Sequence, residues 1–336
     1  MEKFAISLLL IFGLTACGGG GGSPPSSTPS GGSTSNEGED HYWKLPPKSG
    51  GGDQGRVNSI VRQGEWIYYH YHNLEDRSLF STNGVDFKSY LIPGWTSKIV
   101  GVDKTGRIHT AKKYSDDGLN WIDKWKTGGG TSGYILGKAS DLVSSSRKQH
   151  STNGGLTYNS EGLEGPYFEN RQVEIRYPMA WDGQNNFITM GKDAGIWVSN
   201  NYIKNWSQKL ANISTFQVIA GNEYYPNRFF AAHPGKLYTS TDGGRSWSTT
   251  NVPKHNGEIV AEWRDMKILD DGTVLAIVAY PSTSYDYFLA KSPDMGKTWS
   301  FVNQGKPLPG GSEIEANSHY YVLKSGLVGR IYIAPR

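Results

Sequence analysis

Cysteine is almost absent from this chain: among 336 residues the only one is Cys17. A lone thiol excludes a structural disulfide within the chain. Because Cys17 ends an apolar N-terminal run, a processing site is a better interpretation of this residue than a buried structural thiol.

A strong charge of one sign is also missing, since 34 basic residues face 31 acidic ones. That balance argues against nucleic acid as a partner and against a basic surface for anionic lipid. Phosphate loops, EF-hand patterns and nucleophile elbows are absent from the sequence. Long amphipathic helix patterns are missing too, whereas 43 glycines, 20 tyrosines and 11 tryptophans are present. Glycine-rich turns between aromatic strands predict an all-β protein.

The N-terminus has the pattern of a bacterial lipoprotein signal. Lys3 precedes an apolar run, residues 4–16, that is too short to span a bilayer. The run ends in Leu-Thr-Ala-Cys, which resembles a lipobox and implies cleavage after residue 16 and lipidation of Cys17. Several acyl chains give stable anchoring to a membrane. Gly18 follows the cysteine instead of aspartate, so in a Gram-negative cell the resemblance implies the outer membrane, on its periplasmic or surface face.

Residues 17–40 carry the lipidated cysteine and then a tether. The stretch after Cys17 consists of Gly, Ser, Pro, Thr, one Asn and a few acidic residues, with no large apolar side chain to bury. Such composition predicts a flexible spacer. The expected domains are therefore a signal peptide at 1–16, the tether at 17–40 and a globular body at 41–336.

One octapeptide supplies the repeated unit of that body. At 240–247 it reads S-T-D-G-G-R-S-W, the form S-x-D-x-G-x-[ST]-W. The side chains of Ser240 and Asp242 can accept hydrogen bonds from nearby backbone N–H groups and close a compact turn. Gly244 supplies a positive φ without a clashing Cβ. Trp247 begins the next strand and can bury its ring on a neighbouring sheet.

The unit recurs along the chain. Its two other good copies contain Ser292, Asp294, Gly296 and Trp299 and, one residue shorter, Ser115, Asp117, Gly118 and Trp121. Degenerate copies begin at Ser81, Ser151 and Ser199. These turns resemble the Asp-box (BNR) repeat of sialidases and related β-propellers over about residues 81–300. We expect a structural role for the Asp-box side chains, because the bonds inside the turn occupy them.

The repeat period predicts a β-propeller of four-stranded blades. Seven blades of about 42 residues fit the body best, with six blades, or a β-sandwich, as alternatives. In the two clearest blades we expect strands at 214–220, 228–232, 236–240, 247–250, 259–261, 274–279, 287–290 and 299–301. Residues 329–333 look like a third strand and residues 41–47 like a fourth. We therefore expect the N-terminal strand to close the last blade, which removes free sheet edges.

Polar residues on the expected inner strands suggest a binding funnel at the central channel. Glu174 with Arg176, and Glu262 with Arg264, alternate along their strands, which places each pair on one face. Glu313 and Glu315 occur together near the C-terminus. The simpler interpretation is that they are solvated, mutually compensating ion pairs.

The resemblance to sialidases implies three arginines around a sugar carboxylate, an aspartate acid/base and a tyrosine nucleophile. Four arginines are candidates on the inner strands: Arg62, Arg176, Arg228 and Arg264. None lies in the family's local sequence context, so a glycosidase is an alternative and not the favoured function. His70 and His72 share a strand face, but without a third ligand the sequence predicts no metal and no cofactor.

The favoured function is a lipid-anchored binding platform for a protein or glycan, because propellers present rigid faces of loops. Aromatic loops at 224–226 and 281–287 are plausible contact surfaces. The architecture is also similar to the lumenal Asp-box propellers that assist photosystem II assembly, although nothing in the sequence indicates photosynthesis. An immunity lipoprotein against an envelope-delivered toxin is a further alternative.

Overall fold

The structure is a computed structural model, and it describes parts of the chain between residues 56 and 336. The described residues are 56–63, 65–72, 77–82, 87–91, 99–102, 106–110, 113–117, 120–123, 134–136, 142–144, 149–151, 179–190, 195–202, 205–211, 213, 216–283, 286–311, 313–325 and 331–336. They belong to the compact unit Asp40–Arg336.

Within these residues, seven antiparallel sheets of three or four strands follow one another along the chain. The first three are formed by β1 to β4 (Arg56–Gln63, Trp66–His72, Arg77–Thr82, Phe87–Leu91), β5 to β8 (Ile99–Val102, Ile108–Thr110, Lys113–Ser115, Ile122–Asp123) and β9 to β11 (Tyr134–Leu136, Leu142–Ser144, Gln149–Ser151). The next two are formed by β12 to β15 (Met179–Trp181, Phe187–Met190, Gly195–Ser199, Ser207–Ala211) and β16 to β19 (Val218–Gly221, Phe229–His233, Lys236–Ser240, Ser248–Thr250). The last two are formed by β22 to β25 (Glu262–Ile268, Val274–Ala279, Tyr287–Ser292, Ser300–Phe301) and β26 to β28 (Glu313–Ala316, Tyr320–Lys324, Ile331–Pro335).

Little else is regular in the described part. A small hairpin, β20 (Lys254–His255) with β21 (Glu258–Ile259), links two of the sheets, and two short 3-10 helices occupy Pro281–Thr283 and Val302–Gly305. In this part of the chain, no helix has the length and apolar character needed to cross a membrane.

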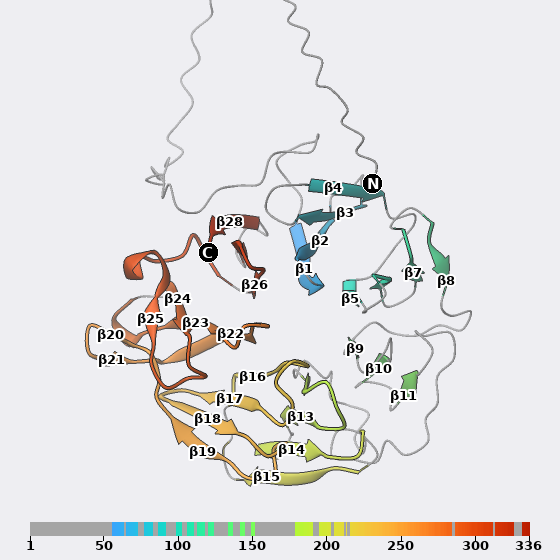
Figure 1. The fold of residues 1–336 in the computed structure, drawn as a ribbon. Coiled ribbons are helices and arrows are strands. Elements are labelled where there is room, and N and C mark those ends of the chain that lie inside the picture. Colours follow the sequence, from blue (N-terminus) through green and yellow to red (C-terminus); the bar gives the residue numbers. More distant parts are fainter. Residues whose placement is uncertain are drawn as a thin grey trace, which may run out of the picture. The chain divides into compact units, whose positions relative to one another are not determined.

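In each of the seven larger sheets of the described residues, sequential strands pair as neighbours, and the first strand lies innermost around a common centre (Figure 1). First strands of successive sheets contact each other: β1 with β5, β5 with β9, β12 with β16, β16 with β22, and β22 with β26. The last of them, β26, contacts β1. The first and last sheets of the described residues therefore lie side by side, as the predicted architecture requires.

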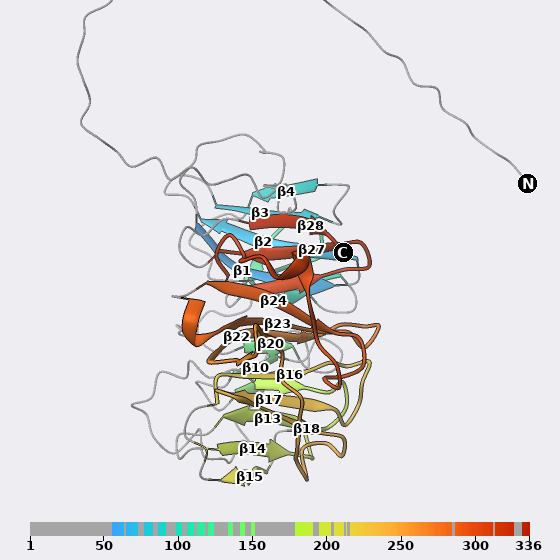
Figure 2. The same cartoon turned by 90° about the vertical axis from the view of Figure 1, so that its left-hand side faces the viewer.

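The hydrophobic core is divided into layers between the faces of adjacent sheets. Figures 1 and 2 show the sheet of β22 to β25 between that of β16 to β19 and that of β26 to β28. All six residues of β23, Val274–Ala279, are buried. Alternate side chains of β23 enter the two layers, Val274, Ala276 and Val278 on one side and Leu275 and Ile277 on the other. This two-sided burial explains why a central strand is a continuous apolar run instead of an alternating one.

The predicted strands at 236–240 and 274–279 are confirmed. The inner strand expected at 259–261 is wrong, because β22 is formed by Glu262–Ile268 and residues 258–259 belong to the β20–β21 hairpin. The true inner strand alternates charged and apolar residues except at a register shift between Trp263 and Asp265, and its apolar residues Trp263, Met266 and Ile268 are the buried ones. The short apolar run at 259–261 was a weaker signal for the inner strand than the alternating pattern that follows it.

The closing strand at 41–47 lies outside the described residues, as does its predicted pairing with Ile331, so strand exchange stays a prediction. One observation bears on β28 itself. Four of its five residues are buried, like those of the third strands β14 and β24, whereas the outermost strands β15 and β19 are mostly exposed. In its burial, β28 therefore resembles the third strands of the other sheets.

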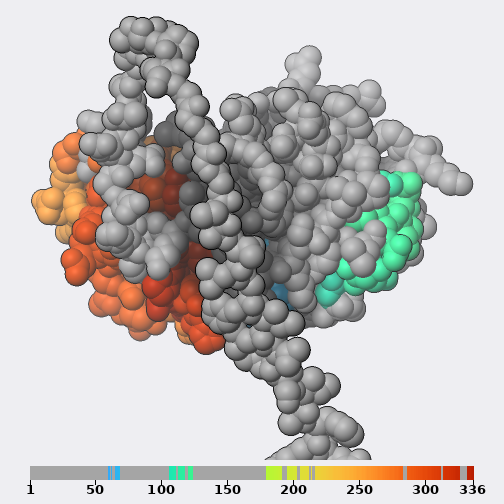
Figure 3. Space-filling model, turned by 90° about the horizontal axis from the view of Figure 1, so that it is seen from above, coloured from blue at the N-terminus to red at the C-terminus, as the bar shows by residue number. Residues whose placement is uncertain are grey.

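The surface of the described residues is seen from above in Figure 3. The C-terminal sheets, orange to red, occupy one side of this face, and residues of β6 to β8, green, occupy the other.

Candidate functional site

The turn at 240–247 is closed by its own side chains. The Ser240 hydroxyl accepts the N–H of Gly244 at 2.8 Å and donates to Asp242 Oδ1 at 2.8 Å. Asp242 in turn accepts the Ser246 N–H at 2.9 Å and the Ser246 hydroxyl at 2.6 Å. Trp247 donates its ring N–H to the Gly244 carbonyl at 2.9 Å. Little hydrogen-bonding capacity in this turn is left for a ligand.

The turn at 292–299 repeats this geometry. Ser292 accepts the Gly296 N–H at 2.7 Å and donates to Asp294, which accepts the Thr298 N–H and hydroxyl. The bonds from Thr298 lower the pKa of Asp294 to about 2. Gly296 has φ +84° and a Cβ there would come within 3.2 Å of the Phe230 ring, so the turn lies directly on the preceding sheet.

Variant turns use the same bonds. Ser115 donates to Asp117, and Asp117 accepts the Asn120 N–H at 2.7 Å. In the degenerate copy, Ser199 donates to Asn201 Oδ1, which accepts the N–H of Asn205. Gly118 lies outside the described residues, as do the turns that follow Ser81 and Ser151.

Of the two Glu–Arg pairs predicted for the funnel, the structure describes one. Arg264 Nε lies 2.7 Å from Glu262 Oε1 and donates to the Tyr287 hydroxyl at 2.7 Å. The guanidinium also stands over the Tyr287 ring at 5.2 Å. These contacts join two strands of one sheet, as a compensating pair does. Glu174 and Arg176 lie outside the described residues.

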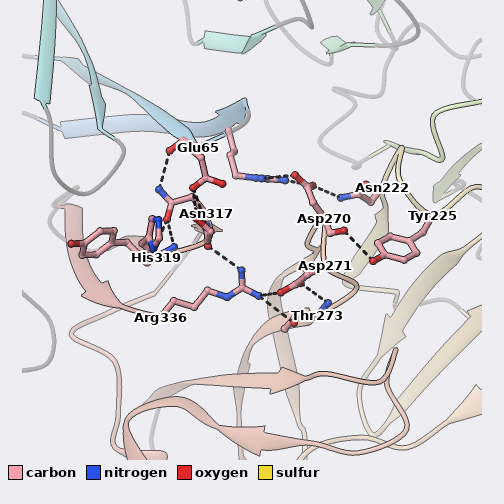
Figure 4. A network of polar contacts seen from close by, with 12 residues as sticks. Glu65, Asn222, Tyr225, Asp270, Asp271, Thr273, Asn317, His319 and Arg336 are labelled. Atoms are coloured by element: carbon pink, nitrogen blue, oxygen red, sulfur yellow. Dashed lines mark hydrogen bonds and ion pairs between the residues drawn. The ribbon is translucent and has the colours of Figure 1, made fainter. Parts of the chain in front are cut away.

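A second polar site lies at the other end of β22, where turns of several sheets converge (Figure 4). Its pocket has a volume of about 390 Å³ and is lined by Arg62, Glu65, Asp270, Asp271, Asn317 and Arg336, among others. We call it the polar pocket. Arg62, near the end of β1, donates from both terminal nitrogens to the Asp270 carboxylate. Since Arg264 lies near the start of β22 and Asp270 just after its end, Arg62 and Arg264 do not share a site.

The loop between β16 and β17 does not line the polar pocket but bonds the backbone of residues 268 and 270 beside it. Asn222 donates to the Ile268 carbonyl at 2.6 Å, and the Tyr225 hydroxyl donates to the Asp270 carbonyl at 3.1 Å. Burial, together with the charges of Asp271 and Asp270, raises the pKa of Tyr225, so it remains a hydrogen-bond donor.

Arg336 and Asn317 line the polar pocket. Arg336 donates to the Asn317 carbonyl at 3.0 Å, to Thr273 Oγ1 at 3.2 Å and to Asp271. Burial alone would raise the pKa of Asp271, but hydrogen bonds from Thr273 and the charge of Arg336 lower it overall. Asn317 also donates to the Glu65 carbonyl at 2.9 Å, which ties the last sheet to the first.

The comparisons with known proteins concern the fold. No family model matches the chain, and no curated relative matches it. Among solved structures, YCF48 from Cyanidioschyzon merolae is 15% identical, with 88% of this chain and 98% of that one covered and a TM-score of 0.62. U3-55K is 10% identical over 89% and 99%, with a TM-score of 0.56. A puromycin-hydrolyzing peptidase of Mycobacterium tuberculosis is 11% identical over 82% and 52%, with a TM-score of 0.50.

The chain is a β-propeller. Identities this low show the architecture and nothing about activity. The predicted all-β propeller fold is confirmed, whereas the number of blades and the closure by the N-terminal strand stay predictions.

In the polar pocket, the positively charged side chains are less exposed than the negatively charged ones. The side chains of Arg62 and Arg336 are 16% and 17% exposed, whereas those of Asp270 and Asp271 are 37% and 54% exposed. The guanidinium groups therefore lie inside and hold the two carboxylates toward solvent. With Glu65 included, three carboxylates oppose two arginines, so this propeller face offers hydrogen-bond acceptors and a small negative charge.

A third polar cluster lies between the inner strands of the propeller. Lys267 Nζ lies 3.1 Å from Glu315 and 3.9 Å from Asp265, and Asp265 accepts the Ile314 N–H at 2.8 Å. Burial raises the pKa of Asp265 to about 6, against the opposing effects of Lys267 and the Ile314 N–H. Burial alone would lower the pKa of Lys267, but Asp265 and Glu315 raise it overall.

Glu313, singled out in the sequence with Glu315, also joins strands of this cluster. It pairs with Lys324 at 2.6 Å and accepts the Ile60 N–H at 3.3 Å, so it connects the last sheet to β1. In the part of the chain that the structure describes, no three His, Cys, Asp or Glu side chains are placed to hold a metal. The strand β2 contains His70 and His72.

Sequence reasoning missed Asp270, Asp271, Asn317 and Arg336. Asp270 and Asp271 precede Gly272, and Asn317 precedes a serine, so both stretches look like ordinary polar turns. The available signal was the position of each turn directly after an inner strand, because turns in that position share one face of a propeller.

Proposed function

We propose that this chain is an interaction platform, a propeller held at the cell envelope by lipid on Cys17 that binds a partner protein at the polar pocket. The observation that supports it is the convergence of residues from three sheets on one pocket whose carboxylates point outward. Binding residues placed on loops over a rigid scaffold are typical of propeller recognition.

The partner segment is expected to be rich in N–H donors or positive charge. Asp270 and Asp271 are held in place by Arg62 and Arg336, so little side-chain entropy is lost when they accept new hydrogen bonds. Complementary charge across the interface would favour association more at low ionic strength.

Site-specific photo-crosslinking in cells tests this platform. A photoreactive residue at Ser318, beside the pocket, should capture a discrete partner from cells that express the full chain. The same residue at exposed Lys209, on the outer strand β15, is the matched control and should not. Equal capture at both positions, or none at Ser318, contradicts the proposal.

A second test removes negative charge from the polar pocket. Asp271→Asn keeps the shape of the side chain and should reduce capture at Ser318 several-fold. Asp123→Asn, which removes an exposed carboxylate from β8, should leave it unchanged. If both variants behave alike, the pocket carboxylates are not the recognition element.

The anchor is tested separately. Cys17→Ser should abolish labelling by a fatty-acid probe and move the protein from the membrane fraction to the soluble fraction. A membrane-bound, unlabelled variant would overturn the lipoprotein part and leave the platform part standing.

The glycosidase alternative has less support. A sialidase needs arginines gathered around one carboxylate, whereas Arg62 and Arg264 lie at opposite ends of β22. Turnover of a fluorogenic sialoside by the purified chain would favour the enzyme over the platform.

A further inference from the structure

A groove independent of the polar pocket lies where the sheet of β16 to β19 meets the turn at 292–299. It has a volume of about 590 Å³, within the range of sites that take small ligands. Its walls include Lys236 and Thr249 from one sheet, and Lys297 and Trp299 from the turn. Lys254, on β20, borders the groove as well. We call it the lysine groove.

The floor of the lysine groove is fixed by hydrogen bonds between the two sheets. Thr250 donates to the Gly296 carbonyl at 3.0 Å, and Asn251 donates to the Lys297 carbonyl at 2.6 Å. Trp299 donates its ring N–H to the Asn251 carbonyl at 3.0 Å. With its only donor occupied, the Trp299 ring can offer a ligand its apolar surface alone.

The charge of the groove has one sign. Lys236, Lys254 and Lys297 are exposed, and no ion pair joins any of them to a described residue. No acidic side chain lines the groove among the described residues. By contrast, Lys267 on β22 and Lys324 on β27 are both paired with glutamates. Three like charges around one hollow repel each other, and an anion between them relieves this repulsion.

We propose that the lysine groove binds an acidic sugar, one that carries carboxylate or sulfate groups. The ammonium groups of Lys236, Lys254 and Lys297 pair with the anionic groups. The Trp299 ring packs on the apolar face of a sugar ring, and the exposed Thr249 hydroxyl is available to ring hydroxyls. An acidic peptide is the less suitable ligand, because Thr250 and Asn251 are already engaged and leave few groups for a peptide backbone.

Fluorescence anisotropy with labelled oligosaccharides tests this site in the full chain, purified in a detergent without a sugar headgroup. The probes are a trigalacturonate for carboxylates, a heparin-derived tetrasaccharide for sulfates, cellotetraose as the neutral sugar and hexaglutamate as the acidic peptide. We expect binding of at least one acidic sugar, weakened by added salt, and much weaker binding of the other two probes.

The double variant Lys254→Gln/Lys297→Gln should weaken acidic-sugar binding about tenfold, since two charge-assisted contacts are lost. The control Lys209→Gln/Lys306→Gln removes the same charge from exposed positions outside the groove and should bind like the unmodified chain. The proposal is overturned if neither acidic sugar binds, if cellotetraose or hexaglutamate binds as tightly, or if both double variants lose binding equally. A normal thermal unfolding transition shows that each variant is folded.

Discussion

Two junctions between sheets of this propeller are built differently. Between the sheets of β16 to β19 and β22 to β25 the layer is apolar, with Phe230, Trp263 and Phe288 among its buried side chains. Between β22, β26 and β1 the inner strands add charged groups, including Asp265 and Lys267. The first junction joins sheets that follow each other in the chain. The second includes contacts between sheets that also follow each other, such as Lys267 with Glu315, and contacts between residues about 250 positions apart, such as Ile60 with Glu313.

The difference indicates what each junction has to achieve. Apolar burial is strong but not directional, which suffices where a short connection already holds two sheets together. Where the two ends of the body meet, hydrogen bonds of defined geometry can also select the register of β26 against β1. We infer that the charged junction contributes specificity as well as stability.

The largest effect on stability should come from deleting the segment that is predicted to complete the last sheet. Deletion of residues 41–47 should cost a large part of the stability of the body, about 5–15 kcal/mol for a whole domain, if this segment closes the sheet of β28. Deletion of residues 18–40 is the control and should leave the thermal unfolding midpoint unchanged. Equal midpoints for both deletions would refute the predicted closure.

The second largest effect on stability is expected from a substitution in the apolar junction. Phe230→Ala removes a ring that is 1% exposed and should lower the free energy of unfolding by about 3–5 kcal/mol. Tyr224→Ala, at a side chain 61% exposed, should change it by less than about 0.5 kcal/mol. Chemical denaturation measures both, and a small loss for Phe230→Ala would mean that this layer is not the main apolar support.

The charged junction should respond to pH. The folded pKa of Asp265, about 6, lies above its ordinary value of 3.8, so the folded state binds more protons between these values. This residue therefore makes stability fall as pH rises from about 4 to about 6, by up to about 3 kcal/mol. Asp265→Asn removes the effect, so its stability relative to the unmodified chain should rise over this interval.

Denaturant melts at pH 4, 5, 6 and 7 measure that difference. The groups that face Asp265 are Lys267, Glu313 and Glu315, and they are unchanged in the variant. A constant difference across the interval would show that Asp265 titrates normally in the folded protein.

The turn at 292–299, on the outer side of the apolar junction, should make an intermediate contribution to the free energy of unfolding. Ser292→Ala leaves the buried Gly296 N–H without its acceptor and should cost about 1–3 kcal/mol. Ser248→Ala, at an exposed position of β19, serves as the matched change and should cost almost nothing. If the two losses are equal, the bracing bonds add little to this junction.

The smallest effects on stability are expected from substitutions of Arg62 and Arg264. Arg264 lies near the start of β22, and Arg62, on β1, contacts the turn that follows its end. Arg62→Gln breaks a two-bond contact between β1 and the β22–β23 turn and should cost about 1–2 kcal/mol. Arg264→Gln breaks a pair inside one sheet and should cost about 0.5 kcal/mol. Reversed magnitudes would mean that the contacts between sheets are not the stabilising ones.

Sequence reasoning succeeded where structure is local. The turn at 240–247 and the strand Val274–Ala279 could be predicted because their residue types and spacing determine hydrogen bonds and burial within a few positions. Alternation along β22 likewise predicted that Glu262 and Arg264 share a face. The polar pocket could not be found in this way, since Arg62 and Asp270 are 208 positions apart and meet only when the sheets assemble. The misplaced inner strand has a similar cause, because the charged residues of β22 are partnered by Glu315 and Ile314 on another sheet.

The strand β23 divides its side chains between two layers, and this division limits local opening of the structure. Neither neighbouring sheet can swing away without exposing side chains that β23 shares with it, so a sheet is not an independent unit of opening. Amide protons of Val274–Ala279 should therefore exchange with solvent only through a collective event that involves three sheets at once, and should be among the slowest in the molecule.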